Sequence, residues 1–343
     1  MAKAKKMPSG NWRVLQYVCT DANGKKQYKS FTAPTKKEAE FMASEYVMKN
    51  NTIKENPTVE QAVQNYIDSR EHTLSVTTIR GYYTIKNNAL GSIKHLLLSQ
   101  LNELILQKWI NQNAKTYSSK SLSNQMGLIT AVAKQNKLDI DFSSIALKPP
   151  VKREMLIPNK EQMAIILSAV EGTSVELPVT IALTLGLRQS EIAALHWTDY
   201  DGRSLSIHSS KLPDKNNQFV EVNRNKSYAS TRCLMVPAIL KTRLDAADRS
   251  SDHICDMLPA SIQRKFKKIC VNAGLPGFTM HGLRHANASI MLLENVPDKY
   301  AMERLGQSTA SMLKNVYQHT FKDAQQQIAD NLDSVFSDIA DAK

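Results

Sequence analysis

With 343 residues, the chain has room for two or three domains that each bury a hydrophobic core. Hydrophobic residues make up 42% and charged residues 22%, as in ordinary soluble globular proteins, and the net charge of +12 makes an anionic partner the first expectation. Four scattered cysteines without a C-x-x-C pair exclude a disulfide framework and a zinc ribbon, and the lack of any run of about 18 apolar residues excludes a membrane span. The basic N-terminus has no apolar stretch after it, so we expect a cytoplasmic protein with reduced thiols and no signal peptide.

Residues 1–50 are predicted to form a small β-β-α unit. The alternating, partly apolar residues Trp12–Cys19 are typical of a strand, and the D-A-N-G turn at 21–24 leads to a returning strand at 28–31. Ten Lys and Arg against four Asp and Glu give this segment a net charge of +6, half of the excess of the chain. This charge favours a nucleic-acid-binding module, with a generic solvated β-β-α unit as the equal alternative.

The helix of this unit begins with a capping box formed by Thr35 and Glu38 and runs to about Met48. Four residues are expected to form its apolar face: Ala39, Met42, Ala43 and Tyr46.

Residues 56–148 predict an all-α domain. After a polar linker at 50–57, Thr58 and Gln61 form a second capping box at the start of a helix. Further helical patterns lie at Thr77–Ala89, Gln100–Asn111 and Lys120–Gln135. Helices joined by short polar loops in this way are typical of a helical domain.

After a stiff basic linker at Leu147–Arg153, residues 155–343 predict a larger, mostly helical domain. Helices are expected at Pro158–Val170 and Val175–Leu185. The second is almost wholly apolar and therefore buried, and Gly186 closes it.

The next helix is predicted to open at Ser190 and Glu191 and to run to Trp197. Three β-like segments follow, at Leu205–Ser209, Phe219–Val222 and Arg232–Val236. The remaining segments return to helix, at Pro237–Ala247, Pro259–Ala273 and from His281 onward. The predicted fold class is therefore mainly α with small β elements (α+β).

The stretch 281–317 carries the groups with the clearest chemistry. H-G-L-R-H places His281 and Arg284 three residues apart, on one face of a helix, and the stretch ends at Tyr317 among apolar neighbours. An imidazole, a guanidinium and a phenol in this order indicate phosphoryl chemistry on a polyanion. Beyond Tyr317, apolar residues at helical spacing and five Asp against two Lys predict an acidic amphipathic tail helix that packs on its own domain or on a neighbour.

Five sequence motifs together resemble those of the tyrosine recombinase, or phage integrase, family. They are G-L-R-Q-S-E-I at 186–192, N-K-S-Y-A-S-T-R-C-L-M-V-P at 225–237, H-G-L-R-H at 281–285, L-G-Q-S at 305–308, and the late Tyr317. The resemblance covers the whole chain and is strongest to integrases of bacterial conjugative transposons and temperate phages. It implies an arm-type DNA-binding domain at 1–50, a helical core-binding (SAM-like) domain at 56–148 and a catalytic domain with a tail helix at 155–343.

The resemblance also assigns roles to single residues. Arg188 and Arg284 would clamp the attacked phosphate, because a planar guanidinium suits two oxygens at once. Tyr317 would be the nucleophile that forms a 3′-phosphotyrosyl bond, and His281 would act in acid–base catalysis. A lysine would protonate the leaving 5′-oxygen; Lys226 is preferred from the family pattern, and Lys211, which ends a β-like segment, is the rival.

Three further residues have supporting or unusual positions. Gln307 stands where the family usually has His or Trp; its amide can donate to a phosphate oxygen but cannot carry a proton. Glu191 and His285 are expected to orient the arginines and the active-site helix. His281 and His285 have the i, i+4 spacing of metal ligands, but no H-E-x-x-H pattern or third ligand accompanies them, so neither a metal nor a cofactor is expected.

The implied function is integration or excision of a mobile element, in which DNA strands are exchanged through a Holliday junction. The implied partners are double-stranded DNA at core and arm sites, a homotetramer on that DNA, and accessory excision or DNA-bending proteins, in the bacterial cytosol at the nucleoid and without a membrane. A type IB-like topoisomerase and a non-catalytic DNA-binding protein of the same fold are the alternatives. The basic N-terminal module argues against the first alternative, and the intact catalytic residues argue against the second.

Overall fold

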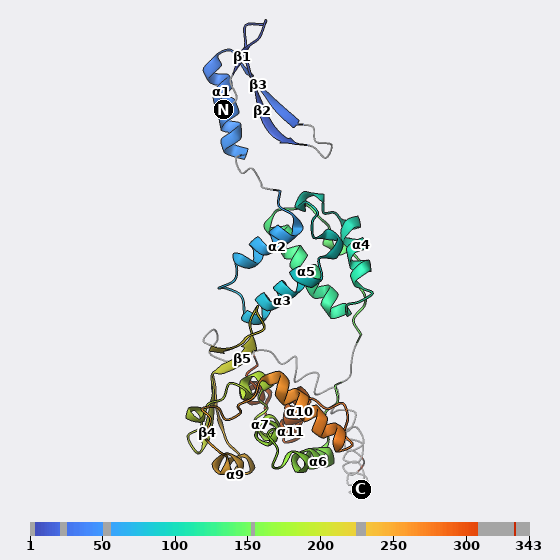
Figure 1. The fold of residues 1–343 in the computed structure, drawn as a ribbon, viewed down its shortest axis with the longest axis vertical. Coiled ribbons are helices and arrows are strands. Elements are labelled where there is room, and N and C mark those ends of the chain that lie inside the picture. Colours follow the sequence, from blue (N-terminus) through green and yellow to red (C-terminus); the bar gives the residue numbers. More distant parts are fainter. Residues whose placement is uncertain are drawn as a thin grey trace, which may run out of the picture. The chain divides into compact units, whose positions relative to one another are not determined.

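The computed structural model describes residues 4–20, 26–50, 56–151, 155–223, 231–307 and 333. The chain divides into two compact units, whose helices and strands are labelled in Figure 1. The first unit contains Met1–Asp68 and Asn88–Lys148, and the second contains Ser69–Asn87 and Pro149–Lys343. Within these described residues, no helix is both long enough and apolar enough to cross a bilayer.

The N-terminal segment forms a three-stranded antiparallel sheet covered by one helix. The strands β1 (Lys5–Lys6), β2 (Trp12–Thr20) and β3 (Lys26–Ala33) follow this order in the sheet, and α1 (Lys36–Asn50) packs on β2 and β3. Half of the predicted capping box is confirmed: the Glu38 main-chain N–H donates to Thr35 Oγ1 at 3.2 Å, but the Glu38 carboxylate accepts from the Thr35 hydroxyl, at 3.0 Å.

The predicted apolar face of α1 is wrong at Met42, which is 43% exposed. Ala39 and Ala43 are buried against Val14 and Ala33 of the sheet. These alanines lie four residues apart and therefore share one face of the helix. Their small side chains form a narrow contact with the sheet, and the longer Met42 lies at its flank.

The helical segment that follows contains α2 (Val59–Asp68), α3 (Val76–Asn88), α4 (Glu103–Asn113) and α5 (Ser119–Gln135), with short 3-10 turns at η1 (Gly91–Ile93), η2 (Leu98–Gln100) and η3 (Phe142–Ser144). The second predicted capping box is confirmed, since the Thr58 main-chain N–H donates to Gln61 Oε1 at 2.9 Å. Trp109 is completely buried in α4, and its indole N–H donates to the Ala89 carbonyl oxygen at 2.8 Å.

The second unit is mostly helical, with two small antiparallel sheets. Besides α3, its helices are α6 (Lys160–Val170), α7 (Glu176–Leu185), α8 (Gln189–Ile192), α9 (Ala238–Ala246), α10 (Pro259–Asn272), α11 (Met280–Leu293) and α12 (Asp298–Leu305), with a 3-10 turn at η4 (Trp197–Asp199). Its strands are β4 (Ser204–Ile207), β5 (Ser209–Pro213), β6 (Phe219–Asn223) and β7 (Arg232–Met235).

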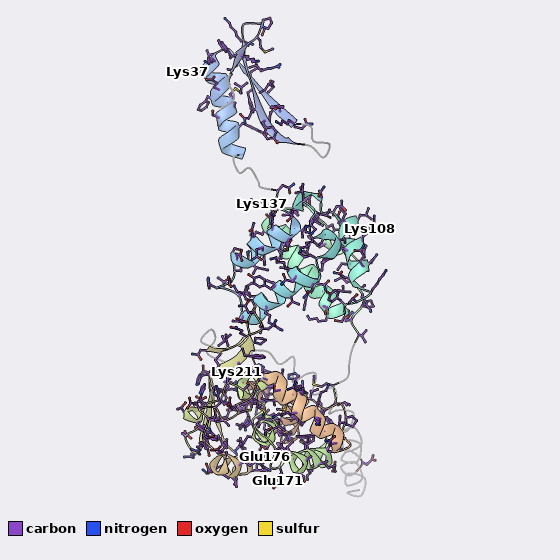
Figure 2. All side chains as sticks on the ribbon, in the orientation of Figure 1. Lys37, Lys108, Lys137, Glu171, Glu176 and Lys211 are labelled. Carbon is purple, nitrogen blue, oxygen red and sulfur yellow. The ribbon has the colours of Figure 1, made fainter. Side chains whose placement is uncertain are left out.

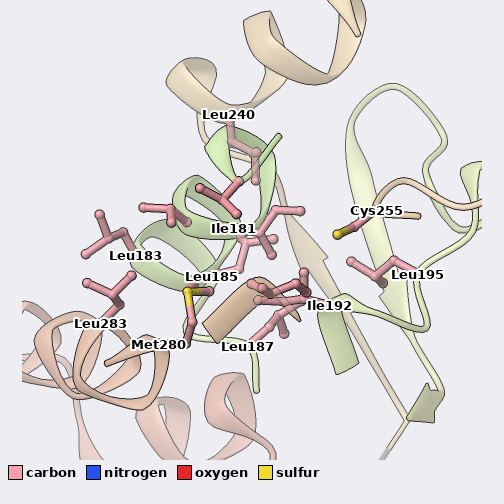
Figure 3. Packing of buried hydrophobic residues seen from close by; sticks show 14 of the residues in the cluster. Ile181, Leu183, Leu185, Leu187, Ile192, Leu195, Leu240, Cys255, Met280 and Leu283 are labelled. Carbon is pink, nitrogen blue, oxygen red and sulfur yellow. The ribbon is translucent and has the colours of Figure 1, made fainter. Parts of the chain in front are cut away.

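Helix α7 lies at the centre of this unit, as its apolar sequence predicts. It packs against α6, α9 and α11, and almost all of its side chains are buried. Figure 3 shows this core around Ile181, Leu183 and Leu185 of α7, with Leu187, Ile192, Met280 and Leu283 close by. Burying side chains of this kind stabilises a fold by about 1.5–3 kcal/mol each.

Two predicted elements of this unit differ from the structure. The predicted strand Leu205–Ser209 is divided at His208, because Ile207 pairs with Arg232 of β7 whereas Ser209 pairs with Asn223 of β6. The helix predicted to run to Trp197 ends at Ile192. A turn follows this helix, and His196 then pairs with His253 as an isolated antiparallel bridge: Ile254 N–H donates to the Leu195 carbonyl and Trp197 N–H to the Asp252 carbonyl.

Candidate active site

The site begins where α7 ends. Gly186 has a left-handed conformation, with φ of 66°, and closes α7. A Cβ atom built there would lie 2.6 Å from both Asn287 Oδ1 and Leu305 Cδ2, so glycine is required for the conformation and for the space. The chain reverses at this point, and Arg188 becomes the residue that precedes α8.

The buried side chain of Glu191 binds Arg188 through two hydrogen bonds. Its carboxylate accepts from the Arg188 main-chain N–H and from Arg188 Nη1, both at 2.8 Å. Burial alone would raise the pKa of Glu191, but the positive charges of Arg232 and Arg188 and their hydrogen bonds lower it from 4.5 to about 2. Glu191 is therefore ionised and orients Arg188, as predicted for a supporting residue.

Arg232 is a site residue that sequence reasoning missed. Its Nη2 donates to Glu191 Oε2 at 2.9 Å, and its Nε donates to the Arg304 carbonyl at 2.9 Å. Its side chain is only 4% exposed. Gly306 makes room for it, because a Cβ atom on that glycine would lie 2.6 Å from Arg232 Nη1. The available signal was the position of Arg232 inside the 225–237 motif, but the motif does not reveal its partner.

Arg284 is held by main-chain oxygens from two separate segments. It is 1% exposed on α11, and it donates from Nη1 to the Gly186 carbonyl and from Nη2 to the Leu305 carbonyl, each at 2.6 Å. Arg188 Nη2 donates to the Gly306 carbonyl at 3.2 Å. Both predicted clamp arginines are thus fixed at the end of α12, although they lie far apart in the sequence.

His281 lies one helical turn before Arg284 and is exposed. Partial burial lowers the pKa of His281 from its usual 6.5, and the positive charges of Arg284 and Arg188 lower it further. The imidazole is therefore mostly neutral at pH 7 and able to accept a proton. His285 is buried behind it, with the two rings edge to face and their centroids 4.7 Å apart.

Gln307 follows Gly306 at the end of α12 and is half-buried. Its main-chain N–H donates to the Met302 carbonyl at 2.9 Å. The residue is therefore adjacent to the Gly306 carbonyl that accepts from Arg188. Tyr317 and Lys226 lie outside the described residues.

Lys211 lies on β5 (Figure 2) and is opposite Glu221 of β6, with Lys211 Nζ 3.7 Å from Glu221 Oε1. Strand β5 packs against α8, the helix that carries Glu191. Ser209 Oγ also donates to the Ala194 carbonyl at 3.2 Å, just beyond that helix. Lys211 thus remains a strong rival to Lys226.

Metal ligands do not converge on His281 in the part of the chain that the structure describes. The one group of three such side chains found there is His196, Glu221 and His253, and it includes neither His281 nor His285. The predicted active site therefore offers guanidinium groups, an imidazole and an amide for binding an anion.

The sequence is similar to known recombinases and integrases. Residues 159–324 match the sequence model described as "Phage integrase family". A "Tyrosine recombinase XerC-like" protein of Caldanaerobacter subterraneus subsp. tengcongensis is 24% identical, and the match covers 95% of this chain and 96% of the relative.

Two solved structures share the fold. The integrase of transposon Tn1549 in complex with transposon right-end DNA has a TM-score of 0.63 at 16% identity, over 80% of this chain and 99% of that one. A lambda integrase tetramer bound to a Holliday junction has a TM-score of 0.57 at 15% identity, over 92% of this chain and 94% of that one. These likenesses confirm the predicted α+β fold.

Proposed function

Since the chain is a tyrosine recombinase of the phage integrase family, we propose that it cleaves and rejoins DNA at specific sites through a 3′-phosphotyrosyl intermediate. Integration or excision of a mobile element is the outcome that this chemistry serves. The observation that carries the proposal is the pair of guanidinium groups, Arg188 and Arg284, held at the end of α12 with His281 on the same helix as Arg284.

The arginines supply what the transition state requires. Negative charge grows on the non-bridging oxygens of the attacked phosphate, and fixed positive groups stabilise it without reorganising during the reaction. Arg188, Arg232 and Arg284 are all ordered by hydrogen bonds within the protein, and the single carboxylate of Glu191 accepts from both Arg188 and Arg232. The set of arginines therefore keeps an excess of positive charge for the phosphate.

The remaining residues complete the displacement. Tyr317 Oη attacks phosphorus and loses its proton, which His281 accepts; the phosphorus–O5′ bond breaks, and a lysine gives the departing O5′ its proton. A phenol has a pKa near 10, so it needs such a base or a positive field to become nucleophilic. Gln307 would donate to a phosphate oxygen, and His285 would support His281 from the core. The phosphotyrosyl bond conserves the phosphodiester energy, so rejoining requires no cofactor.

Double-stranded DNA is the proposed substrate, bound by a homotetramer through core sites and, at the N-terminus, through arm sites. The relatives support this proposal, because solved structures of this fold include an integrase on transposon-end DNA and a tetramer on a Holliday junction. The basic segment 1–50 fits arm-site binding, residues 56–148 fit core-site binding, and residues 155–343 fit catalysis with a tail helix that docks on a neighbour. The proposed location is the bacterial cytosol.

A nicked duplex carrying the cognate core site tests the proposal. Cleavage releases a short 5′-hydroxyl fragment that diffuses away, so the covalent protein–DNA adduct accumulates. We expect this adduct from the native chain and none from Tyr317→Phe, whereas Tyr300→Phe, at an exposed tyrosine of α12, should behave as the native chain. No adduct from the native chain would refute the proposal. Relaxation of supercoiled DNA that lacks the site would instead favour a topoisomerase.

A further inference from the structure

Three side chains with metal-binding atoms converge away from the arginines. His196 precedes η4, Glu221 lies on β6 and His253 lies between α9 and α10. His196 Nε2 is 3.0 Å from Glu221 Oε2, and His253 Nε2 is 2.7 Å from Glu221 Oε1. The three side chains can present one donor atom each with no two donors more than 4.8 Å apart.

The main chain fixes this arrangement. His196 and His253 face each other as an isolated antiparallel bridge, with hydrogen bonds from Trp197 N–H to the Asp252 carbonyl and from Ile254 N–H to the Leu195 carbonyl. Their imidazole centroids are 4.2 Å apart. Glu221 is presented from a separate hairpin by its pairing with Lys211. Main-chain hydrogen bonds therefore place all three residues, and contacts between their side chains are not needed to bring them together.

We propose that His196, Glu221 and His253 bind a divalent transition-metal ion of the Zn²⁺ type. Two imidazoles and one carboxylate are a ligand set that such ions accept, with water completing the coordination. Ligands about 2.0–2.1 Å from a tetrahedral ion are separated from one another by roughly 3.3 Å. The observed Nε2–oxygen separations of 2.7 and 3.0 Å, one to each oxygen of Glu221, must lengthen slightly, and any donor pair near the 4.8 Å limit must shorten, both by side-chain rotation.

The side chains remain accessible to an ion. They are 30%, 32% and 20% exposed for His196, Glu221 and His253 respectively. In the metal-free arrangement each Nε2 donates a hydrogen bond to Glu221, and an ion held through both Nε2 atoms requires that the N–H of each ring lie on Nδ1 instead. The ion would join the β5–β6 hairpin to the segments at 196 and 253.

The hairpin also carries Lys211, whose Nζ is 3.7 Å from Glu221 Oε1. A metal ion on Glu221 therefore competes with Lys211 for the same carboxylate. Its positive charge also repels the ammonium group, so occupancy of the site loosens the Lys211–Glu221 pair.

Zinc binding to the full-length chain tests this proposal without DNA, so its outcome is independent of recombinase activity. The chain is first stripped with a chelator, and Zn²⁺ uptake is then measured by titration calorimetry and by metal analysis after dialysis. The single variants His196→Ala, Glu221→Gln and His253→Ala should each lose one equivalent of zinc. Loss of a residue that only hydrogen-bonds to a metal ligand lowers metal affinity by roughly 10–100-fold. Because these variants lose a ligand itself, their affinity for zinc should fall by more than that.

His208→Ala is the matched control. His208 also pairs with a carboxylate, that of Asp199, with 2.7 Å between Nε2 and Oδ1, but it is not part of the three-residue group. This variant should retain the native equivalent of zinc. Equal uptake by the native chain and the three ligand variants would overturn the proposal.

Cobalt supplies a readout that does not depend on whether the variants fold. Co²⁺ added to the native chain should give the visible d–d bands of a nitrogen and oxygen site without a thiolate-to-cobalt charge-transfer band. Cys255, two residues after His253, is buried and does not belong to the three-residue group. A spectrum dominated by thiolate, or no spectrum beyond that of aqueous Co²⁺, would also overturn the proposal.

Discussion

The carboxylate of Glu191 accepts a hydrogen bond of 2.9 Å from Arg232 Nη2, although the two residues lie 41 positions apart in the sequence. The same carboxylate accepts from Arg188. Arg232 is also bonded to the Arg304 carbonyl, so it connects the start of α8 to the end of α12. Through Glu191, Arg232 is linked to Arg188, the residue that we propose to bind the phosphate.

Arg232→Met should destabilise the protein strongly. It leaves the buried Glu191 carboxylate without its main charge partner, and breaking a buried pair typically costs about 3–5 kcal/mol. Urea unfolding of the second unit measures the loss. The control is Arg243→Met, which breaks the more exposed Arg243–Glu176 pair of similar length, 2.8 Å against 2.9 Å, and should cost about 1 kcal/mol or less. Similar losses in both variants would contradict a special role for Arg232.

Glu191 should make the stability of the protein depend on pH in the acid range. Its native pKa is lowered from 4.5 to about 2, so between these values the unfolded chain binds more protons than the native chain. The stabilisation is complete above about pH 5 and is lost as the pH falls through 2. At about 1.4 kcal/mol per pKa unit, the native chain should lose roughly 3 kcal/mol relative to Glu191→Gln over this range. Parallel unfolding free energies for the two chains would refute this prediction.

Gly186→Ala should be more harmful than Gly172→Ala. Both glycines have φ near +67°, at 66° and 68°, so both substitutions introduce backbone strain of about 1 kcal/mol or more. A Cβ at Gly172 meets nothing within 4 Å, whereas at Gly186 it meets Asn287 and Leu305. Gly186→Ala should therefore cost roughly 1–3 kcal/mol more than Gly172→Ala, as overpacking does. Thermal unfolding of the two variants makes the comparison, and equal melting temperatures would count against the close approach.

Lys211→Ala and Lys226→Ala separate the two candidates for the general acid. Loss of the acid should slow cleavage by about 10²–10⁴-fold on ordinary DNA. A substrate with sulfur in place of the bridging 5′-oxygen should restore the rate, because a thiol with pKa of about 8.5 leaves without protonation. The variant that shows both effects identifies the lysine. If neither variant is rescued, the leaving oxygen is protonated by another group.

Local sequence signals predicted the parts of the fold that depend on neighbouring residues. The capping box at Thr58, the N-cap bond at Thr35 and the helix end at Gly186 are confirmed, because each depends on residues within one helical turn. The predicted length of the helix that begins at Ser190 was wrong, and so was the prediction of a single strand at Leu205–Ser209. Both depend on pairing with distant segments, at 252–254 and at β6 and β7, which periodicity does not encode.

In the candidate site, too, residues within local motifs were predicted, and a residue that depends on a distant partner was missed. Arg188, Glu191 and Arg284 were predicted from their motifs, and the structure brings them together. Arg232 was missed, since its partner Glu191 is identified only when the chain is folded. The choice between Lys211 and Lys226 and the role of Tyr317 stay predictions.

The main-chain carbonyls that hold the two clamp arginines determine when those side chains become ordered. A free arginine side chain carries about 2 kcal/mol of rotamer entropy, which must be lost before it can grip a phosphate in one geometry. Arg284 and Arg188 are already fixed on the carbonyls of Gly186, Leu305 and Gly306. Most of this entropy is thus lost during folding, so more of the energy of DNA binding remains for recognising the site.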